Sequence, residues 1–407
     1  MVKRMETDVL FYSGIFPKDM EAEIVASSKG NVANADNVFQ WNLIDGLDKC
    51  LGRPVSLLNC INVGSYPKRY KRLFIPSFAF SHADGANDYN VGFCNLTGYK
   101  RHSRNSATKK HVKRWAKDGK NDKVLIAYAM YESPMLALRT AKLANPDVKT
   151  CLIVPDLPQF LSTTTKQSLA YKILKRFRKK KDLYAELKYV DSYVVLTEQM
   201  LEKLGNKPHA VVEGVSSDVF SGIERTVPEK KTVVYAGSLA LKYGIGALLE
   251  AFSLIEGEDY RLIVCGRGDA EALVKEYCER DDRITYAGIL PRSEVLKAYR
   301  SASVLVNPRK NEGEYTKYSF PSKIMEYLSS GVSAVAFKLD GIPDEYDQYI
   351  NYVDGNAPED FAKAIKTACD DEDGSHARRA ESAREFVLKE KSSVVQAQKI
   401  VDLLKIR

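Results

Sequence analysis

Residues 318–331, Tyr-Ser-Phe-Pro-Ser-Lys-Ile-Met-Glu-Tyr-Leu-Ser-Ser-Gly, combine residue types that suit a diphosphate and a sugar. Pro321 is typical of the start of a helix and Gly331 of its end. The unpaired N–H groups of the first helical turn, the positive end of the helix dipole and Lys323 would attract a diphosphate. Glu326, about one turn later, is placed to accept hydrogen bonds from ribose hydroxyls. The alternative, from these residues alone, is an ordinary helix that starts after a proline.

Strand-length apolar runs alternate with helix-length segments, which is typical of parallel sheets covered by helices. The runs are 9–12, 55–60, 124–130, 151–154 and 193–197, and after Gly214 they are 232–236, 261–265, 284–287, 304–306 and 332–337. A chain of 407 residues can bury two cores, since single domains seldom exceed about 250 residues. The sequence therefore predicts an α/β protein with two Rossmann-like domains, 1–213 and 214–385, joined near 211–228.

The loops after the strands of the second domain carry the expected chemistry, because ligands of open parallel sheets bind beyond the carboxyl ends of the strands. Glycine lets a phosphate approach the backbone closely, and cationic side chains neutralise a leaving diphosphate. Three loops fit: Gly237-Ser238 to Lys242, Gly266-Arg267-Gly268, and the segment from Arg309. Each alone is typical of a turn or a surface charge, but together with 321–326 they predict a binding site for the donor of a transferred group.

Residues 190–370 resemble the family 4 glycosyltransferases of GT-B fold. The order and spacing of five segments carry this resemblance: 211–220, Tyr-Ala-Gly-Ser-Leu (235–239), 263–268, 303–309 and 326–331. The resemblance implies GT-B architecture, with two Rossmann-like domains facing across a cleft. It also implies that a C-terminal helix, residues 386–407 at the end of a long helical pattern over 377–406, packs back on the first domain. The activity implied is retaining transfer of a sugar from a nucleotide diphosphate sugar, with no cofactor and no metal.

Three positions depart from the pattern of that family. Tyr318 stands where the first Glu of the family's Glu-x7-Glu motif would fall, Ser238 stands where Arg is frequent, and Lys242 is one residue away from the usual Lys. A catalytically inactive nucleotide-sugar-binding scaffold protein is therefore the alternative to an enzyme. A two-domain dehydrogenase is disfavoured, because neither domain has Gly-x-Gly-x-x-Gly after an early strand.

The first domain is expected to hold the acceptor, and Asp156 is its candidate residue. It follows the strand at 151–154, where relatives often carry a His-Asp pair, although Pro155 replaces that histidine here. Asp156 either orients an acceptor hydroxyl or belongs to an Asp-Leu-Pro turn. The predicted catalytic residues are Asp156, Lys242 and Glu326. The predicted donor-binding residues are Gly237, Ser238, Gly266, Arg267, Arg309, Tyr318, Ser319, Phe320, Pro321, Ser322 and Lys323. No metal site is predicted, and the acidic run 370–373 is interpreted as a solvated loop.

The net charge of +8 is unevenly divided along the chain. Residues 1–213 carry 34 Lys+Arg and 21 Asp+Glu, and the remainder carries 27 and 32, so the two parts have charges of +13 and −5. Basic residues gather at 100–123 and 172–188, and bulky apolar residues lie among them. These runs are either solvated faces or a surface for an anionic membrane, and the apolar residues favour a peripheral membrane helix. No motif supports nucleic-acid binding.

Cysteine usage and hydropathy indicate the compartment. The seven scattered cysteines form no Cys-x-x-Cys pair, which fits a reducing environment. The N-terminus lacks the pattern of a signal peptide, and no run approaches about 18 apolar residues. We therefore expect a cytoplasmic protein, peripheral on the inner face of the cell membrane. We expect it to glycosylate a glycan or lipid-linked glycan acceptor in cell-surface polysaccharide assembly.

Overall fold

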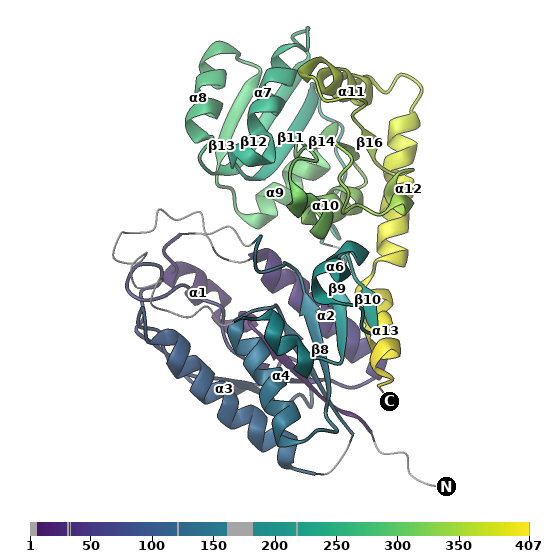
Figure 1. Ribbon diagram of the computed structural model, residues 1–407. Helices are drawn as coiled ribbons and strands as arrows, with labels where there is room; N and C mark the ends of the chain where they lie inside the picture. The colour runs from purple at the N-terminus through teal and green to yellow at the C-terminus, as the bar shows by residue number, and fades with distance from the viewer. Residues whose placement is uncertain are drawn as a thin grey trace. The chain divides into compact units, whose positions relative to one another are not determined.

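The computed structural model (Figure 1) describes residues 6–30, 32, 34–119, 122–160, 182–216 and 219–406. They form two compact units: unit 1 consists of residues 1–213 with 393–407, and unit 2 of residues 214–392. Each unit is built on a parallel sheet with helices. The predicted α/β fold class is confirmed. The basic segment 161–181, which includes most of the second predicted basic run, lies outside the described residues.

Unit 1 contains an eight-stranded sheet in the order β10-β9-β8-β7-β1-β2-β5-β4. All neighbouring strands are parallel except β4 and β5. The order reverses at β1, which lies between β7 and β2, and such a switch point is where open α/β sheets bind ligands. The strands are β1 (Asp8–Ser13), β2 (Ser56–Asn59), β4 (Phe78–Phe80), β5 (Asp88–Asn90), β7 (Lys123–Tyr128), β8 (Lys149–Val154), β9 (Ser192–Val195) and β10 (His209–Val211). A separate antiparallel pair joins β3 (Phe74–Ile75) to β6 (Phe93–Cys94).

The described helices of unit 1 include one from the C-terminal end of the chain. They are α1 (Glu21–Ser27), α2 (Asn34–Leu51), α3 (Lys100–Lys117), α4 (Glu132–Ala144), α6 (Leu201–Leu204) and α13 (Ser393–Leu404). The yellow α13 packs along the purple α2 in Figure 1. Gly46 of α2 makes this close approach possible, because a methyl group there would overlap the Ser393 carbonyl and lie 2.8 Å from the Ala397 Cβ.

Unit 2 contains a six-stranded, wholly parallel sheet in the order β13-β12-β11-β14-β15-β16. Its first strand, β11, lies between β12 and β14, so this order also reverses beside the first strand. The strands are β11 (Lys231–Ser238), β12 (Tyr260–Arg267), β13 (Ile284–Gly288), β14 (Val304–Asn307), β15 (Ser333–Ala336) and β16 (Asn351–Tyr352). The helices are α7 (Ile245–Ser253), α8 (Glu271–Arg280), α9 (Arg292–Arg300), α10 (Ser322–Ser330), α11 (Pro358–Asp370) and α12 (Ser375–Glu390).

The C-terminal part of the chain differs from the single long helix expected over 377–406. It forms two helices, α12 in unit 2 and α13 in unit 1, so the expected boundary at 385/386 lies inside α12. The break has a tertiary cause. The Lys391 carbonyl accepts a hydrogen bond from the Ser216 N–H at 2.8 Å, and the buried Lys391 ammonium lies 2.7 Å from Glu345. No glycine or proline marks this break, so helical periodicity alone continues through it.

Candidate functional site

The switch point of unit 2 is formed by backbone that carries almost no side chain. Gly237 and Gly266 are paired in the sheet, as are Ser238 and Arg267 beyond them. A methyl group on Gly266 would overlap the Gly237 carbonyl, and Gly266 has a φ of 134°, a conformation that favours glycine. The ends of β11 and β12 therefore expose main chain to any ligand at this edge.

Lys323, in the first turn of α10, reaches this glycine edge. Its ammonium lies 3.8 Å from the centroid of the Tyr235 ring, and a methyl group on Gly237 would overlap it. Burial lowers the pKa of Lys323 to about 7, although the nearby Glu326 acts in the opposite direction. No hydrogen bond or ion pair to this ammonium is found in the described part of the chain. The arrangement places an ammonium without a hydrogen-bonded partner in the described residues beside bare backbone and a helix N-terminus, which suits a phosphate.

Glu326 lies on the same helix and forms an ion pair with Arg292, the first residue of α9, at 2.8 Å. Arg292 was not among the predicted residues. Arg292 follows β13. The rule that ligands bind beyond the carboxyl ends of parallel strands, which selected the other loops, also applies to Arg292. Glu326 is the residue expected to contact ribose, and Arg292 holds its carboxylate in place.

Arg309 also lies within this region, between aromatic side chains. Its guanidinium is 4.6 Å from the ring centroid of Tyr315 and 5.9 Å from that of Tyr243, and it donates a hydrogen bond to the Ser319 hydroxyl at 3.0 Å. The buried Arg309 Nε has no hydrogen-bond partner within the described ranges. Lys242 lies 5.0 Å from the centroid of the same Tyr243 ring. Tyr243 thus lies close to both cations.

The other predicted donor-site residues occupy different environments. Arg267 is exposed, with its Nε 3.7 Å from Glu271, and Ser322 at the start of α10 is exposed. Tyr318, Phe320 and Pro321 are buried. The Tyr318 hydroxyl donates to Glu314 at 3.2 Å, and the Phe320 ring packs 5.3 Å from that of Tyr346. These buried side chains fix the loop that presents Ser319 and α10.

Asp156 is exposed after β8 in unit 1 and belongs to a small group of acids and tyrosines. Asp36 of α2 accepts a hydrogen bond from the Tyr128 hydroxyl at 2.9 Å, and burial raises the pKa of Asp36. Burial, together with the charges of Asp36 and Asp156, raises the pKa of Tyr131 to about 12. The sequence around Asp36 gives no sign that this residue contacts Tyr128. The fold alone brings Asp36 near the end of β7.

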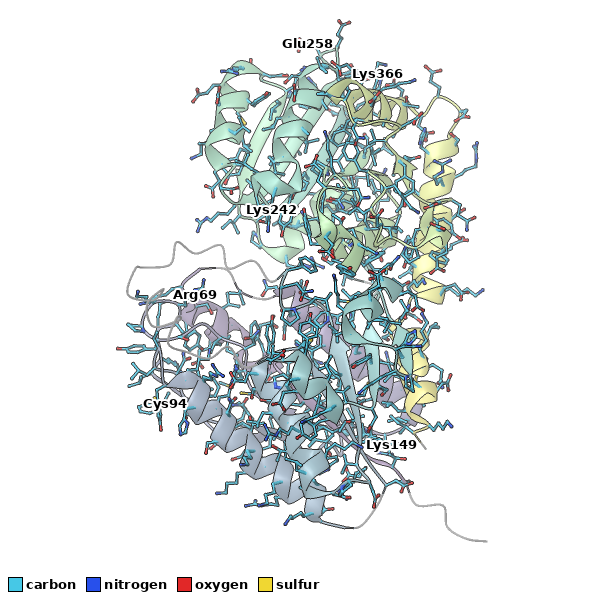
Figure 2. All side chains as sticks on the ribbon, viewed as in Figure 1. Arg69, Cys94, Lys149, Lys242, Glu258 and Lys366 are labelled. Carbon is cyan, nitrogen blue, oxygen red and sulfur yellow. The ribbon has the colours of Figure 1, made fainter. Side chains whose placement is uncertain are left out.

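Two further acidic groups have structural partners. Glu132 pairs with Arg101 and accepts a hydrogen bond from Asn105 at 3.0 Å. Of the acidic run interpreted as a solvated loop, residues 371–373 do lie in a loop, with Glu372 and Asp373 exposed. Asp370 differs, because it ends α11 and binds Lys231 at 2.7 Å and Lys366 at 2.5 Å. Figure 2 shows Lys366 and Lys242 at opposite ends of unit 2, so Asp370 lies far from the candidate donor site. The described residues contain no acid, His or Cys cluster suited to a metal.

Comparisons with known proteins find relatives for part of the chain. Residues 230–371 match the model of the family Glycosyl transferases group 1. The chain is 28% identical over 166 residues to D-inositol 3-phosphate glycosyltransferase of Corynebacterium kroppenstedtii, covering 37% of this chain and 35% of that protein. The chain thus spans about a third of the length of the curated relatives that it matches.

Solved structures match over almost the whole chain. Sucrose-phosphate synthase from Thermosynechococcus elongatus has a TM-score of 0.64 at 15% identity, covering 98% of both chains. Anabaena Alr3699/HepE in complex with UDP has a TM-score of 0.61 at 13% identity, covering 98% of this chain and 99% of that one. At such identities the likeness establishes the fold. No helix among the described residues has the length and apolar character needed to cross a membrane.

Proposed function

The chain has the fold of the GT-B glycosyltransferases and carries a glycosyl transferases group 1 match over residues 230–371, and from this premise we propose that it is a retaining glycosyltransferase. It would move a sugar from a nucleotide diphosphate sugar to a glycan or lipid-linked glycan acceptor in cell-surface polysaccharide assembly. The observation that carries the proposal is the Lys323 ammonium, which lies over Gly237 at the switch point of unit 2.

The proposed chemistry is electrostatic. As the sugar departs, positive charge develops on the sugar and negative charge grows on the diphosphate, so fixed cations and helix N–H groups stabilise the transition state. Lys323 and the first turn of α10 supply this stabilisation, with Arg309 nearby. Relatives often have an arginine at the position of Ser238. Lys323 lies beside the neighbouring Gly237 and would supply the positive charge that Ser238 lacks. Glu326, held by Arg292, binds the ribose.

The acceptor would bind to unit 1 near Asp156. Asp36, Tyr131 and Asp156 supply hydrogen-bonding groups of the kind that orient a sugar hydroxyl. The relative from Corynebacterium is named for an inositol phosphate acceptor, and the sucrose-phosphate synthase for a sugar phosphate product. These names favour a polyol or sugar acceptor, soluble or carried on a lipid.

The first test is the thermal midpoint of the protein with UDP, GDP and dTDP in separate samples. A ligand that binds only the native state at about ten times its Kd adds about 1.4 kcal/mol, or a shift of roughly 3–5 °C for a domain of this size. UDP is tested first, because a structural neighbour binds it. We expect one of the three nucleotides to raise the thermal midpoint. We expect Lys323→Met to abolish that shift. No shift with any of the three at millimolar concentration would remove the donor site from the proposal.

A further inference from the structure

A second group of cations lies at the carboxyl edge of the unit 1 sheet. Lys100 and Arg104 are four residues apart on α3 and therefore share one face of that helix. Thr108, one turn further along this face, is fully buried, and its hydroxyl lies 3.0 Å from that of Tyr12 in β1. This contact turns the face with Lys100 and Arg104 toward the sheet.

The Lys100 side chain faces the segment that follows β2, and Arg104 lies on the same face of α3. The Lys100 ammonium donates a hydrogen bond to the Val63 carbonyl and lies 5.7 Å from the centroid of the Phe93 ring. Burial raises the pKa of the Cys60 thiol, and the charges of Arg104 and Lys100 oppose that shift. The two cations are therefore close enough to Cys60, directly after β2, to act on it electrostatically.

Arg69 adds a third positive charge to this group. A methyl group on Gly64 would overlap the Arg69 Cβ, so the turn that carries Arg69 packs tightly on the segment after β2. Burial lowers the pKa of Lys100 to about 8, and the charges of Arg104 and Arg69 act in the same direction. Figure 2 shows Arg69 at the opposite end of unit 1 from Lys149, where β8 begins.

These three cations have no carboxylate partner within the described residues. No ion pair to Arg69, Lys100 or Arg104 is found there, and the buried Arg104 Nε has no hydrogen-bond partner. The neighbouring Arg101, in contrast, is paired with Glu132. Lys100 and Arg104 are half-buried, whereas Arg69 is exposed. Half-buried like charges without a counter-charge destabilise a fold, so the presence of Lys100 and Arg104 needs a reason. A ligand that brings negative charge supplies one.

We propose that Arg69, Lys100 and Arg104 bind a phosphate ester carried by the sugar acceptor. This inference rests on the proposed glycosyl transfer, which assigns the acceptor to unit 1. Guanidinium groups bind phosphate oxygens through paired hydrogen bonds, and an ammonium adds a point charge. The group lies beside β1, where the strand order of unit 1 reverses and ligands of such sheets bind. A phosphate ester occurs both on a soluble sugar phosphate and on a lipid headgroup.

The test compares wild type with Arg104→Gln, using calorimetry with glucose 6-phosphate and with glucose. Wild type should bind glucose 6-phosphate more tightly than glucose, and Arg104→Gln should weaken glucose 6-phosphate binding by about tenfold or more. Arg104→Lys, which keeps the charge, should retain part of the affinity. Lys117→Gln is the control, because it removes one exposed charge at the other end of α3 and should leave the affinity within about twofold.

A lipid headgroup as the source gives a different result. Glucose 6-phosphate would then not bind, whereas binding to phosphatidylcholine vesicles that contain phosphatidic acid would depend on Arg104. The proposal is overturned if neither probe depends on Arg104, or if Lys117→Gln weakens binding as much as Arg104→Gln does.

The thermal shift that UDP induces in each variant distinguishes a failure of the phosphate-site inference from a failure of the proposed glycosyl transfer. A normal shift in Arg104→Gln shows that the fold and the donor site are intact, so a lost phosphate dependence can then be assigned to unit 1. If no nucleotide shifts wild type while phosphate binding depends on Arg104, glycosyl transfer fails and the anion site stands.

Discussion

Lys323 is a residue of unit 2 whose charge state we expect to change when a ligand binds. Burial holds its pKa near 7, so it is about half protonated at neutral pH in the free protein. A bound diphosphate favours the protonated form, so binding takes up a proton. Affinity for the donor should accordingly fall as the pH rises through 7.

We predict that UDP-glucose binds about tenfold more weakly at pH 8 than at pH 6, because the protonated fraction of Lys323 falls by about that factor. UDP-glucose is preferred to UDP, since its diphosphate has no ionisation in this range. Calorimetry at both pH values measures the effect. Lys323→Met should bind weakly with the same affinity at both values, and an equal pH dependence in that variant would contradict the assignment to Lys323.

Glu326 gives the second prediction at this scale. Glu326→Ala should lower turnover of the nucleotide sugar by more than tenfold, because it removes the carboxylate expected to bind ribose and leaves Arg292 without its partner. Glu294→Ala is the matched control, since it removes an exposed carboxylate from α9 that pairs only with Lys297 at 2.9 Å in the described structure. An unchanged rate in Glu326→Ala would exclude it from the site.

The sequence identified the helix that carries Lys323 and Glu326, because Pro321 and Gly331 mark its ends. It did not show which residues these two side chains would meet. Arg292 and Tyr235 come from other segments, and their contacts depend on how the strands of unit 2 are ordered. In the same way, Tyr318 reads as a ligand residue in the motif, whereas packing buries it against the loop.

At the scale of elements, all ten predicted strands are found because each is a buried apolar run flanked by turns. Six short strands among the described residues, β3, β4, β5, β6, β10 and β16, were not predicted, since they contain two or three residues each and lack a detectable period. The break between α12 and α13 was not predicted, because the sequence around it is compatible with a continuous helix.

Gly46 tests the packing of α13 on α2. Gly46→Ala should destabilise unit 1 by about 2 kcal/mol, because the new methyl group overlaps backbone and overpacking outweighs the gain in helix propensity. Gly246→Ala in α7 is the control. Its methyl group would lie 3.7 Å from Leu273, an ordinary contact, so stability should stay equal or rise. Urea unfolding measures both, and equal stability of the two variants would contradict the close contact.

At the scale of the whole molecule, part of the excess positive charge of residues 1–213 lies on α3. Lys109, Lys110 and Lys113 of α3 are exposed, and no ion pair to them is found in the ranges that the structure describes. Tyr99, directly before α3, is 50% exposed, and Phe74 of the same unit is 65% exposed. This combination of cations and apolar side chains suits an anionic membrane surface, which we propose as the site of action. Residues 172–181 of the other basic run, 172–188, lie outside the described residues.

The membrane proposal predicts that Lys109→Gln/Lys110→Gln/Lys113→Gln lowers partition onto phosphatidylglycerol vesicles by about a hundredfold, at roughly 1 kcal/mol for each lysine near the headgroups. Sedimentation with vesicles measures it, and phosphatidylcholine vesicles are the control. Undiminished partition of the triple variant would discard α3 as the membrane surface.

The return of the chain to unit 1 at Ser393 also sets an order on synthesis. Residues 214–392 emerge from the ribosome as one uninterrupted segment, whereas the surface of α2 around Gly46 stays uncovered until α13 has been synthesised. Until then, this surface of α2 lacks the helix that packs on it. Unit 2 is therefore synthesised completely before unit 1, although its synthesis begins later. Nascent chains halted shortly before residue 393 should engage chaperones through their N-terminal part.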